Sequence, residues 1–525
     1  MSKQSERLLT QLGGIRDDFI EEAEEPVPER VGKRPWMRRT VMAASLAVIL
    51  FTAGVFSGVI PLPRPGGSSS SAGGSGVNSP DSGPTTFMSY AGPVFPLTLR
   101  ETDNGLTAQR EITLDFAPWI AATEEDGYTR AFTDILVTDA YVLSNTSEED
   151  KSVSVLYPFS CPLYNLAECI PTLTANGAEL DTVLHAGGYS GGFRGADGDM
   201  EEPLLNLDQL DSWEDYKALL SDGRYQAAAL EAYPDLSEVP VIVYRFFDYY
   251  GPEPDEEAGY PNPSIRAGFD LDYDRTTVLS YGFHAASYDR ENGTMIQGFS
   301  IPRPYNPWYG DSYYLIVMGD DIRNLTIGAY VTGGTDEDTK KLDNAGVKVE
   351  RYASNLETAL RTPAELMYGR SGLVQKSGAD FDLYFGLLKE FVCSYGILSE
   401  EPVERYYTGW LEDLNVANVD RVFYLEAEIT VPAGETVLLT AEITKKGSYD
   451  FYCAHTENRG VYGYDLVTEL GSNLTCTGQR ATIEDRGMIE IVRQNFGFNL
   501  ERDLRTVDLD PMQEHYYLEV RGSIK

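Results

Sequence analysis

Apolar and polar residues alternate along much of the chain, which is the pattern of β-strands that bury one face. The alternation is clear in residues 112–116, 135–143 and 423–431. A polar turn separates residues 135–143 from a further apolar stretch at 153–159, and this order predicts an antiparallel strand pair of a β-sandwich. In residues 381–395 the apolar positions recur at helical spacing instead. The pattern therefore predicts a mainly β fold of the β-sandwich type with helical insertions.

One apolar stretch, residues 41–60, shows no alternation and carries no charged side chain. A helix of this length spans about 30 Å, the hydrocarbon thickness of a bilayer. Five cations stand in residues 30–39, whereas the other flank offers only Arg64 before Arg100. The positive-inside rule then predicts a single transmembrane helix in the cell membrane, with a cytoplasmic N-terminus and an extracytoplasmic C-terminal bulk. A cleaved signal peptide is the alternative, although this stretch is longer and starts later than such peptides usually do.

The changes of pattern along the chain predict six segments. They are a cytoplasmic tail (1–39), a transmembrane helix (40–60), a Gly/Ser/Pro linker (61–85), an extracytoplasmic β-sandwich region with a helical insertion (86–375), a helical connector (376–418) and a C-terminal β-sandwich module (419–525). The linker holds no core-forming residues, so it is expected to be a flexible tether. Within the first β region, Asn176 and Gly177 predict a tight hairpin turn.

The charge distribution limits the partners of the chain. The sequence has 42 basic and 82 acidic residues, and residues 66–525 carry 33 and 74 of these, a net charge of −41. Such a surface repels nucleic acid, so no nucleic-acid binding is expected outside the membrane. A soluble acidic exterior is one interpretation of this charge, and attraction of Ca²⁺ or of a cationic partner is the other. An apolar content of 42% argues against disorder as its origin.

The five cysteines are Cys161, Cys169, Cys393, Cys453 and Cys476, and they form no C-x-x-C pair. Their spacing excludes a zinc ribbon or a thioredoxin-type site. In an exported domain, Cys161–Cys169 and Cys453–Cys476 would be the local disulfide pairs. Cys393 falls in a helical apolar pattern and is expected to be a small buried hydrophobe. In a reducing environment all five would remain thiols.

Motifs of catalysis are incomplete. Residues 188–192 match the G-x-S-x-G motif of the α/β-hydrolase nucleophile, but a Gly- and Asp-rich loop follows where that motif requires a helix. The four histidines, His185, His284, His455 and His515, form no metal-binding spacing. The chain is therefore expected not to be an enzyme, and an extracellular hydrolase is kept as an alternative.

An acidic loop offers the start of a calcium motif. Asp270, Asp272 and Asp274 have D-x-D-x-D spacing, but Arg275 follows where the sharp turn of an EF-hand needs glycine. A looser Ca²⁺ site in this or another acidic loop stays an alternative to a solvated turn, and no other cofactor is expected.

Aromatic residues supply the candidate ligand contacts. Tyr305, Trp308 and Tyr309 lie in a proline-containing loop. Exposed tyrosine and tryptophan rings can stack on sugars, so these residues are expected to contact a surface glycan or protein ligand. Packing between strands is the alternative role.

The N-terminal tail has its own apolar face. Ile15, Phe19 and Ile20 recur at helical spacing in a segment too short to be a stable helix alone, so they are candidate contacts for a cytoplasmic protein partner. The sequence LLTQLGGIRDDFIEEA at residues 8–23, the basic residues before the anchor and the single span resemble the N-termini of single-pass membrane-anchored proteins of Gram-positive bacteria. Some proteins of that layout act as anti-sigma-type regulators, which implies a tail that holds a transcription factor.

These observations favour a non-catalytic, single-pass membrane protein that displays a β-rich binding ectodomain at the cell surface. The alternative is a transmembrane signalling regulator of the anti-sigma type with a sensing ectodomain. The apolar face of the tail favours this alternative, because a plain anchor does not need one.

Overall fold

The computed structural model describes residues 87–523 except 90, 126–127, 190–191, 194–208, 211–216, 219, 222, 302–311, 336–338, 400–409, 415 and 451–459. All described residues belong to one compact unit, residues 79–525. The expected tail, membrane helix and linker therefore lie outside the described residues. Among the helices that are described, none has the length and apolar character needed to cross a membrane.

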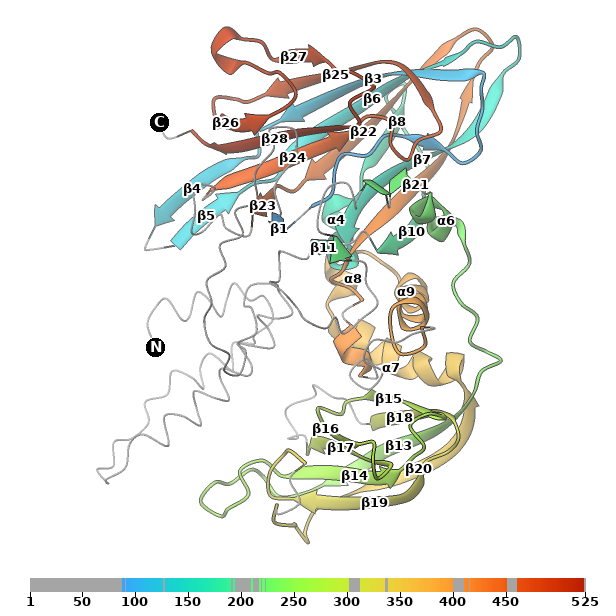
Figure 1. Cartoon of the computed structure of the whole chain (residues 1–525), viewed down its shortest axis with the longest axis vertical. Helices are drawn as coiled ribbons and strands as arrows, with labels where there is room; N and C mark the ends of the chain where they lie inside the picture. The colour runs from blue at the N-terminus through green and yellow to red at the C-terminus, as the bar shows by residue number, and fades with distance from the viewer. Residues whose placement is uncertain are drawn as a thin grey trace. The chain divides into compact units, whose positions relative to one another are not determined.

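Strands from the two ends of the described region build one two-layered β arrangement, which we name the base module (Figure 1). Its first layer is a seven-stranded sheet in the order β27 (Thr506–Asp508), β25 (Thr475–Glu484), β3 (Leu106–Asp115), β6 (Ile135–Asn145), β22 (Thr436–Lys445), β8 (Thr172–Ala175) and β9 (Ala178–Glu179). Opposite it lie a four-stranded sheet, β10 (Val183–Tyr189), β21 (Asp420–Val431), β7 (Lys151–Pro162) and β2 (Thr98–Leu99), and a five-stranded sheet, β1 (Phe87–Ser89), β23 (Ser448–Asp450), β24 (Val461–Val467), β28 (His515–Gly522) and β26 (Ile489–Gln494). One core joins Ile112 and Leu143 of the first layer to Leu425 and Leu518 of the second.

The polar turn after β6 connects the two layers. β6 pairs with β3 and β22 in the seven-stranded sheet, whereas β7 pairs with β21 and β2 in the opposite layer. The predicted antiparallel pairing of residues 135–143 with 153–159 is therefore wrong, although both stretches are strands. Alternation identifies the buried face of each strand, and these two strands bury that face against the same core from opposite sides. Period two alone cannot distinguish such an arch from a hairpin.

The predicted hairpin turn at Asn176 and Gly177 is confirmed. It connects β8 to β9, whose Ala175 and Ala178 are paired. Asn176 and Gly177 have φ of 50° and 80°. Two consecutive residues with positive φ make the turn whose twist matches that of the flanking strands, and Asn-Gly is the sequence that adopts it most readily.

A second β module is inserted between two neighbouring strands of the base module. β10 and β21 pair antiparallel, from Val183 with Glu426 to Tyr189 with Arg421, and residues 190–419 lie between them in sequence. The insertion therefore stands where a hairpin loop would otherwise connect the two strands (Figure 1). The expected boundaries at residues 375 and 418 assign residues 86–375 and 419–525 to separate β regions. In the structure, strands after residue 419 share sheets with strands before residue 190.

The inserted module consists of two four-stranded sheets and the helices that pack on one of them. The first sheet has the order β15 (Thr276–Tyr281), β18 (Ser312–Gly319), β13 (Pro240–Tyr250) and β20 (Gly346–Asn355), and the second has the order β16 (Ala285–Asp289), β17 (Thr294–Ser300), β14 (Ser264–Asp270) and β19 (Arg323–Tyr330). The helices are α7 (Leu356–Arg370), α8 (Leu373–Lys376) and α9 (Phe381–Ser394). Phe246 and Phe299 belong to the core between the sheets. Val243 and Ile316, on the other face of the first sheet, share a core with Leu388 of α9.

Burial on both faces explains the unbroken apolar sequence of β18. Tyr313 and Leu315 face the core between the two sheets. Tyr314 and Ile316 point the other way, into the core that contains the helices. A strand covered on both sides has no solvent face and therefore loses the alternation that marks the strands of the base module.

The helical pattern at residues 381–395 is confirmed as α9. The Asp380 carboxylate caps the helix by accepting a hydrogen bond from the Leu383 N–H at 2.8 Å. Gly386 allows a close approach of Tyr233, since a Cβ at this position would lie 2.3 Å from the Tyr233 ring.

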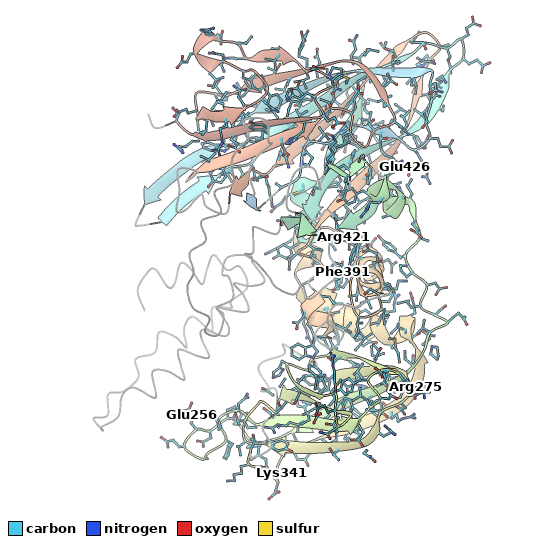
Figure 2. All side chains as sticks on the ribbon, in the orientation of Figure 1. Glu256, Arg275, Lys341, Phe391, Arg421 and Glu426 are labelled. Atoms are coloured by element: carbon cyan, nitrogen blue, oxygen red, sulfur yellow. The ribbon has the colours of Figure 1, made fainter. Side chains whose placement is uncertain are left out.

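Contacts between α9 and β21 join the two modules. Arg421 donates from Nη2 to Glu390 Oε2 at 2.6 Å and from Nη1 to the Gly187 carbonyl at 3.1 Å. Its guanidinium carbon lies 5.9 Å from the centre of the Phe391 ring (Figure 2).

Shorter elements complete the described fold: η1 (Leu163–Asn165), α4 (Leu166–Cys169), η4 (Leu411–Leu414), η6 (Leu500–Arg502), α6 (Arg224–Leu230), the pair β4 (Ile120–Glu125) and β5 (Tyr128–Phe132), and the pair β11 (Gly192–Phe193) and β12 (Gln209–Leu210). The mainly β fold predicted from the alternation is confirmed.

Candidate functional site

Most residues singled out from the sequence do not meet in one place. The expected ligand contacts Tyr305, Trp308 and Tyr309 lie outside the described residues, and so do the expected tail contacts Ile15, Phe19 and Ile20. Ser190, His455 and Cys453 are also outside them. The roles proposed for these residues stay predictions.

The three described histidines lie apart and have separate partners. His185 Nε2 on β10 lies 2.7 Å from Glu426 Oε2, and His515 Nε2 on β28 lies 3.0 Å from Asp465 Oδ2. His284, in the inserted module, lies 3.1 Å from the Ser300 hydroxyl.

The acidic loop after β14 forms an ordinary polar turn. Asp270 accepts a hydrogen bond from the Asn324 amide at 2.6 Å, and Asp272 accepts one from the Asp274 N–H at 3.1 Å. Within the described residues, no group of three or more His, Cys, Asp or Glu side chains is placed to hold a metal ion. The Ca²⁺ alternative stays a prediction.

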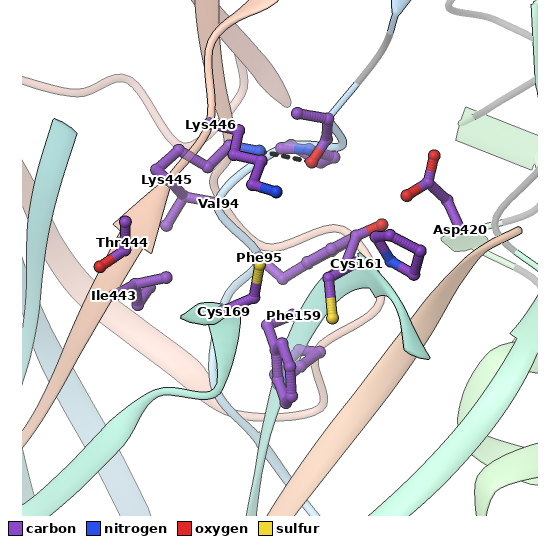
Figure 3. Close-up of a pocket in the computed structure, with 15 residues that line it drawn as sticks. Val94, Phe95, Phe159, Cys161, Cys169, Asp420, Ile443, Thr444, Lys445 and Lys446 are labelled. Atoms are coloured by element: carbon purple, nitrogen blue, oxygen red, sulfur yellow. Dashed lines mark hydrogen bonds between the residues drawn. The ribbon is translucent and has the colours of Figure 1, made fainter. Parts of the chain in front are cut away.

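A small cavity in the base module brings chemistry-bearing side chains together (Figure 3). It has a volume of about 50 Å³ and is lined by the thiols of Cys161 and Cys169, by Lys445 and Lys446, and by Asp420. We name these five residues the dithiol cluster. Apolar side chains form much of the remaining wall, among them Val94, Phe95, Phe159 and Ile443.

The local fold explains how the two cysteines meet. Cys161 lies near the end of β7, where Pro162 precedes the turn of η1 and α4. That turn carries Cys169 back, as the last residue of α4, to face Cys161. Both are buried, with 3% and 6% of their surface exposed, and they are free thiols that line the same cavity.

The two thiols differ in acidity because their surroundings differ. The neighbouring Cys161 lowers the pKa of Cys169, and the positive charges of Lys446 and Lys445 act in the same direction. Burial raises the pKa of Cys161, and its neighbours Cys169 and Asp420 raise it further. The arrangement therefore favours a thiolate at Cys169 over one at Cys161.

Lys445 is an unusual residue for the interior of a β-sheet. Only 7% of its surface is exposed, and its Nζ donates to the carbonyl oxygens of Ala91, at 2.6 Å, and of Gly92. Burial lowers its pKa, while Asp465, Cys169 and Asp420 oppose that shift. Burial of the Asp420 carboxyl raises its pKa to about 6. The cavity therefore contains positive charge and two thiols within a largely apolar wall.

The sequence analysis noted the pair Cys161 and Cys169 but missed Lys445 and Asp420. A signal for Lys445 was present, because it continues the buried series Leu439, Ala441 and Ile443 at period two in β22. A lysine at an apolar position of an alternating strand indicates a buried cation with local acceptors. Asp420 had no comparable signal, since its position follows from the pairing of β21 with β7.

A second buried cluster has a structural role. Arg110 and Asp139 pair in the base-module core, with Nε to Oδ1 at 2.8 Å and Nη2 to Oδ2 at 2.9 Å. Tyr141 and Tyr157 each donate a hydroxyl to Asp139 Oδ2 at 2.9 Å. Arg110 also donates to the backbone carbonyls of Phe95 and Val467. These groups satisfy one another, so the cluster ties the two layers together.

Comparison with known proteins does not assign this chain to a family. No known family matches the sequence, and no curated protein matches it. Among solved structures, the monomeric photosensitizing fluorescent protein Supernova aligns with 48% of this chain and 96% of its own, at 8% sequence identity and a TM-score of 0.06. A TM-score this low carries no argument about fold or function, so a function for this chain rests on its own residues.

Proposed function

We propose that this chain is a single-pass membrane protein whose β-rich outer region is a non-catalytic binding ectodomain, and that the inserted module is its ligand-recognising part. One observation supports this most: a whole β module occupies the position of the hairpin loop between β10 and β21. Loops held by a rigid β scaffold are where proteins commonly carry binding surfaces. A module in that position is presented by the base module in the same way.

Charge and side-chain chemistry narrow the ligand class. The region 66–525 has a net charge of −41, which disfavours nucleic acid and other polyanions. The inserted module exposes tyrosines at its strands, with 62% of Tyr250 on β13 and 38% of Tyr352 on β20 accessible. Tyrosine combines a flat apolar ring with a polar tip and is enriched where proteins bind one another. A surface glycan or a neutral or cationic protein is the ligand that this surface fits.

Site-specific photo-crosslinking on intact cells tests the role of the inserted module. A photoreactive amino acid replaces Tyr352, 38% exposed on β20, or in a separate variant Leu438, 43% exposed on β22 of the base module. The two positions match in exposure and both lie on strands, so accessibility alone should give equal labelling. We expect crosslinked ligand at Tyr352 and none at Leu438. Equal crosslinking at both positions, or crosslinking at Leu438 alone, would contradict the proposal.

The regulator alternative is supported by one specific observation, the dithiol cluster. A sensing ectodomain needs a group that changes chemical state, and two thiols that line one cavity can do so. A pull-down from host membranes, comparing the full-length chain with one lacking residues 2–32, distinguishes the two functions. A cytosolic transcription factor lost together with the tail would favour the regulator, and an unchanged set of partners would favour the binding protein.

A further inference from the structure

The dithiol cluster has no part in the binding function proposed above, yet its residues meet the requirements of a reactive thiol site. A reactive cysteine needs nearby positive charge and access for its reagent, whereas a structural cysteine is enclosed by apolar groups. Cys169 borders the cavity together with Lys445 and Lys446. Cys393 and Cys476 do not line this cavity, and burial raises the pKa of both.

We propose that Cys161 and Cys169 form a peroxide-reactive dithiol, in which Cys169 attacks the peroxide and Cys161 resolves the product to an intramolecular disulfide. This activity goes beyond the binding function and does not depend on it.

The surroundings of the two sulfur atoms assign the two roles. Cys169 lines the cavity beside Cys161, Lys445 and Lys446 (Figure 3), and these neighbours lower its pKa, so its thiolate is the stabilised one. Glu168 opposes this effect from the neighbouring position on α4. Burial raises the pKa of Cys161, and the charge of Asp420 acts in the same direction, so Cys161 keeps its proton. Lys445 is held in place by the backbone carbonyls of Ala91 and Gly92, which fixes its charge beside the cavity.

The size of the cavity selects the oxidant. A bound water needs roughly 10–15 Å³ of such a cavity, so the volume of about 50 Å³ admits a molecule as small as hydrogen peroxide. A disulfide of tripeptide size does not fit. The reagent that reaches Cys169 is therefore a small peroxide and not a low-molecular-weight thiol disulfide.

The proposed reaction between the two thiols and one hydrogen peroxide is balanced in atoms and electrons. The Cys169 thiolate attacks one peroxide oxygen, the O–O bond breaks, and the departing hydroxide takes the proton lost when Cys169 ionised, which leaves a sulfenic acid and one water. The Cys161 sulfur then attacks the Cys169 sulfur, and the expelled hydroxide takes the Cys161 proton to form a second water. Two thiols are oxidised to one disulfide and one peroxide is reduced to two waters.

The rate difference between cysteines can be estimated from their acidities. Burial raises the pKa of Cys476 to about 11, whereas that of Cys169 lies below its ordinary value of 9. At neutral pH this difference gives Cys169 at least about 100-fold more thiolate, and its lower intrinsic nucleophilicity cancels about half of that gain on a logarithmic scale. We therefore expect Cys169 to react at least about tenfold faster than Cys476.

The experiment uses the reduced full-length chain in detergent with Cys453→Ser, which removes the thiol outside the described residues. The protein is treated with one equivalent of hydrogen peroxide, quenched with an alkylating reagent at several times and digested for mass spectrometry. We expect a linked Cys161–Cys169 peptide to form at least about tenfold faster than Cys476 loses its thiol. Absence of the linked peptide, or equal loss at Cys476, would overturn the proposal.

Two single substitutions separate the roles, with circular dichroism confirming that each variant is folded. Cys161→Ser keeps a small polar side chain at this position but cannot form the disulfide, so the Cys169 sulfenic acid should persist and react with dimedone. Cys169→Ser should leave Cys161 unreactive. Oxidation of Cys161 at the wild-type rate in Cys169→Ser would reverse the roles and refute the assignment. As a size control, oxidised glutathione should not form the disulfide, and equal reaction with it would refute the selection by cavity volume.

Discussion

Asp139 is the residue whose substitution tests most directly how the base module is held together. Its side chain is fully buried and accepts four hydrogen bonds, two from Arg110 and one each from Tyr141 and Tyr157. The substitution Asp139→Asn keeps the shape of the side chain but removes its charge. It also places an amide N–H₂ against groups that donate hydrogen bonds.

The expected effect follows from the charge left behind. Arg110 is as deeply buried as Asp139 and has no other carboxylate within ion-pair distance in the described residues. Removing one partner of a buried ion pair costs about 3–5 kcal/mol, because the remaining charge stays desolvated and uncompensated. We therefore expect Asp139→Asn to lower the free energy of unfolding by about 3–5 kcal/mol.

Urea unfolding of the full-length protein, followed by far-UV circular dichroism, measures this change. The control is Asp508→Asn, which removes the partner of Arg480 from a pair at 3.0 Å with 51% and 82% of the side chains exposed. An exposed pair contributes at most about 1 kcal/mol, so this variant should be nearly neutral. The double variant Arg110→Met/Asp139→Leu should regain much of the stability, since no charge then remains buried.

Two results would refute the reasoning. A loss of stability from Asp139→Asn no larger than that from Asp508→Asn would mean that the buried pair makes no net contribution beyond an exposed one. A double variant as unstable as Asp139→Asn would mean that the loss comes from the shape of the site and not from the uncompensated charge.

Four further predictions concern single positions. Gly177→Ala should lower the free energy of unfolding by about 1–2 kcal/mol in urea titrations, because its φ of 80° is strained for alanine. An added Cβ at this position meets no atom within 4 Å, so the cost should come from the backbone alone. A larger loss would contradict this explanation. Gly386→Ala should cost about 1–3 kcal/mol in the same assay through overlap with the Tyr233 ring, and an unchanged midpoint would show that the ring moves aside freely. Asp380→Ala should cost about 1 kcal/mol by removing the cap of α9, whereas Asp380→Asn should retain most of the stability. Because burial raises the pKa of Asp420 from 3.8 to about 6, the folded state binds its proton more tightly than the unfolded state, and stability should fall as pH rises from 4 to 6. Urea titrations across that range should show a smaller fall for Asp420→Asn, and identical slopes would contradict the assignment to this carboxyl.

The sequence predicted the elements of this fold better than their partners. Alternation located the strands of the base module, including β6 and β21, because each has one face against the core. It did not predict that β6 and β7 lie in opposite layers, since a strand's buried face looks the same in either layer. The helix α9 and the turn at Asn176 and Gly177 were predictable because both depend on local backbone chemistry.

The candidate site shows the same limit. The spacing of Cys161 and Cys169 is local, so their proximity could be anticipated, although the structure holds them as free thiols and not as the expected disulfide. Lys445 and Asp420 reach the cavity only through strand pairing across more than two hundred residues of sequence, from β21 to β7 and from β22 to β6. No local pattern records that pairing. The period-two pattern of β22 marks Lys445 as buried, but only the structure shows that Lys445 and Asp420 lie beside the thiols.

The insertion between β10 and β21 also determines the order in which the chain can fold during synthesis. The β10 strand leaves the ribosome about 230 residues before its partner β21, which takes roughly 10–50 s at about 5–20 residues per second. During that interval β6 and β7 each lack a neighbour from the C-terminal part of the chain, so the nascent base module exposes unpaired strand edges. The inserted module can complete both of its sheets in this time, because all their strands lie between residues 240 and 355. The part of the protein nearer the N-terminus therefore finishes folding last, and it depends on prompt release of the C-terminal strands or on a chaperone to avoid aggregation.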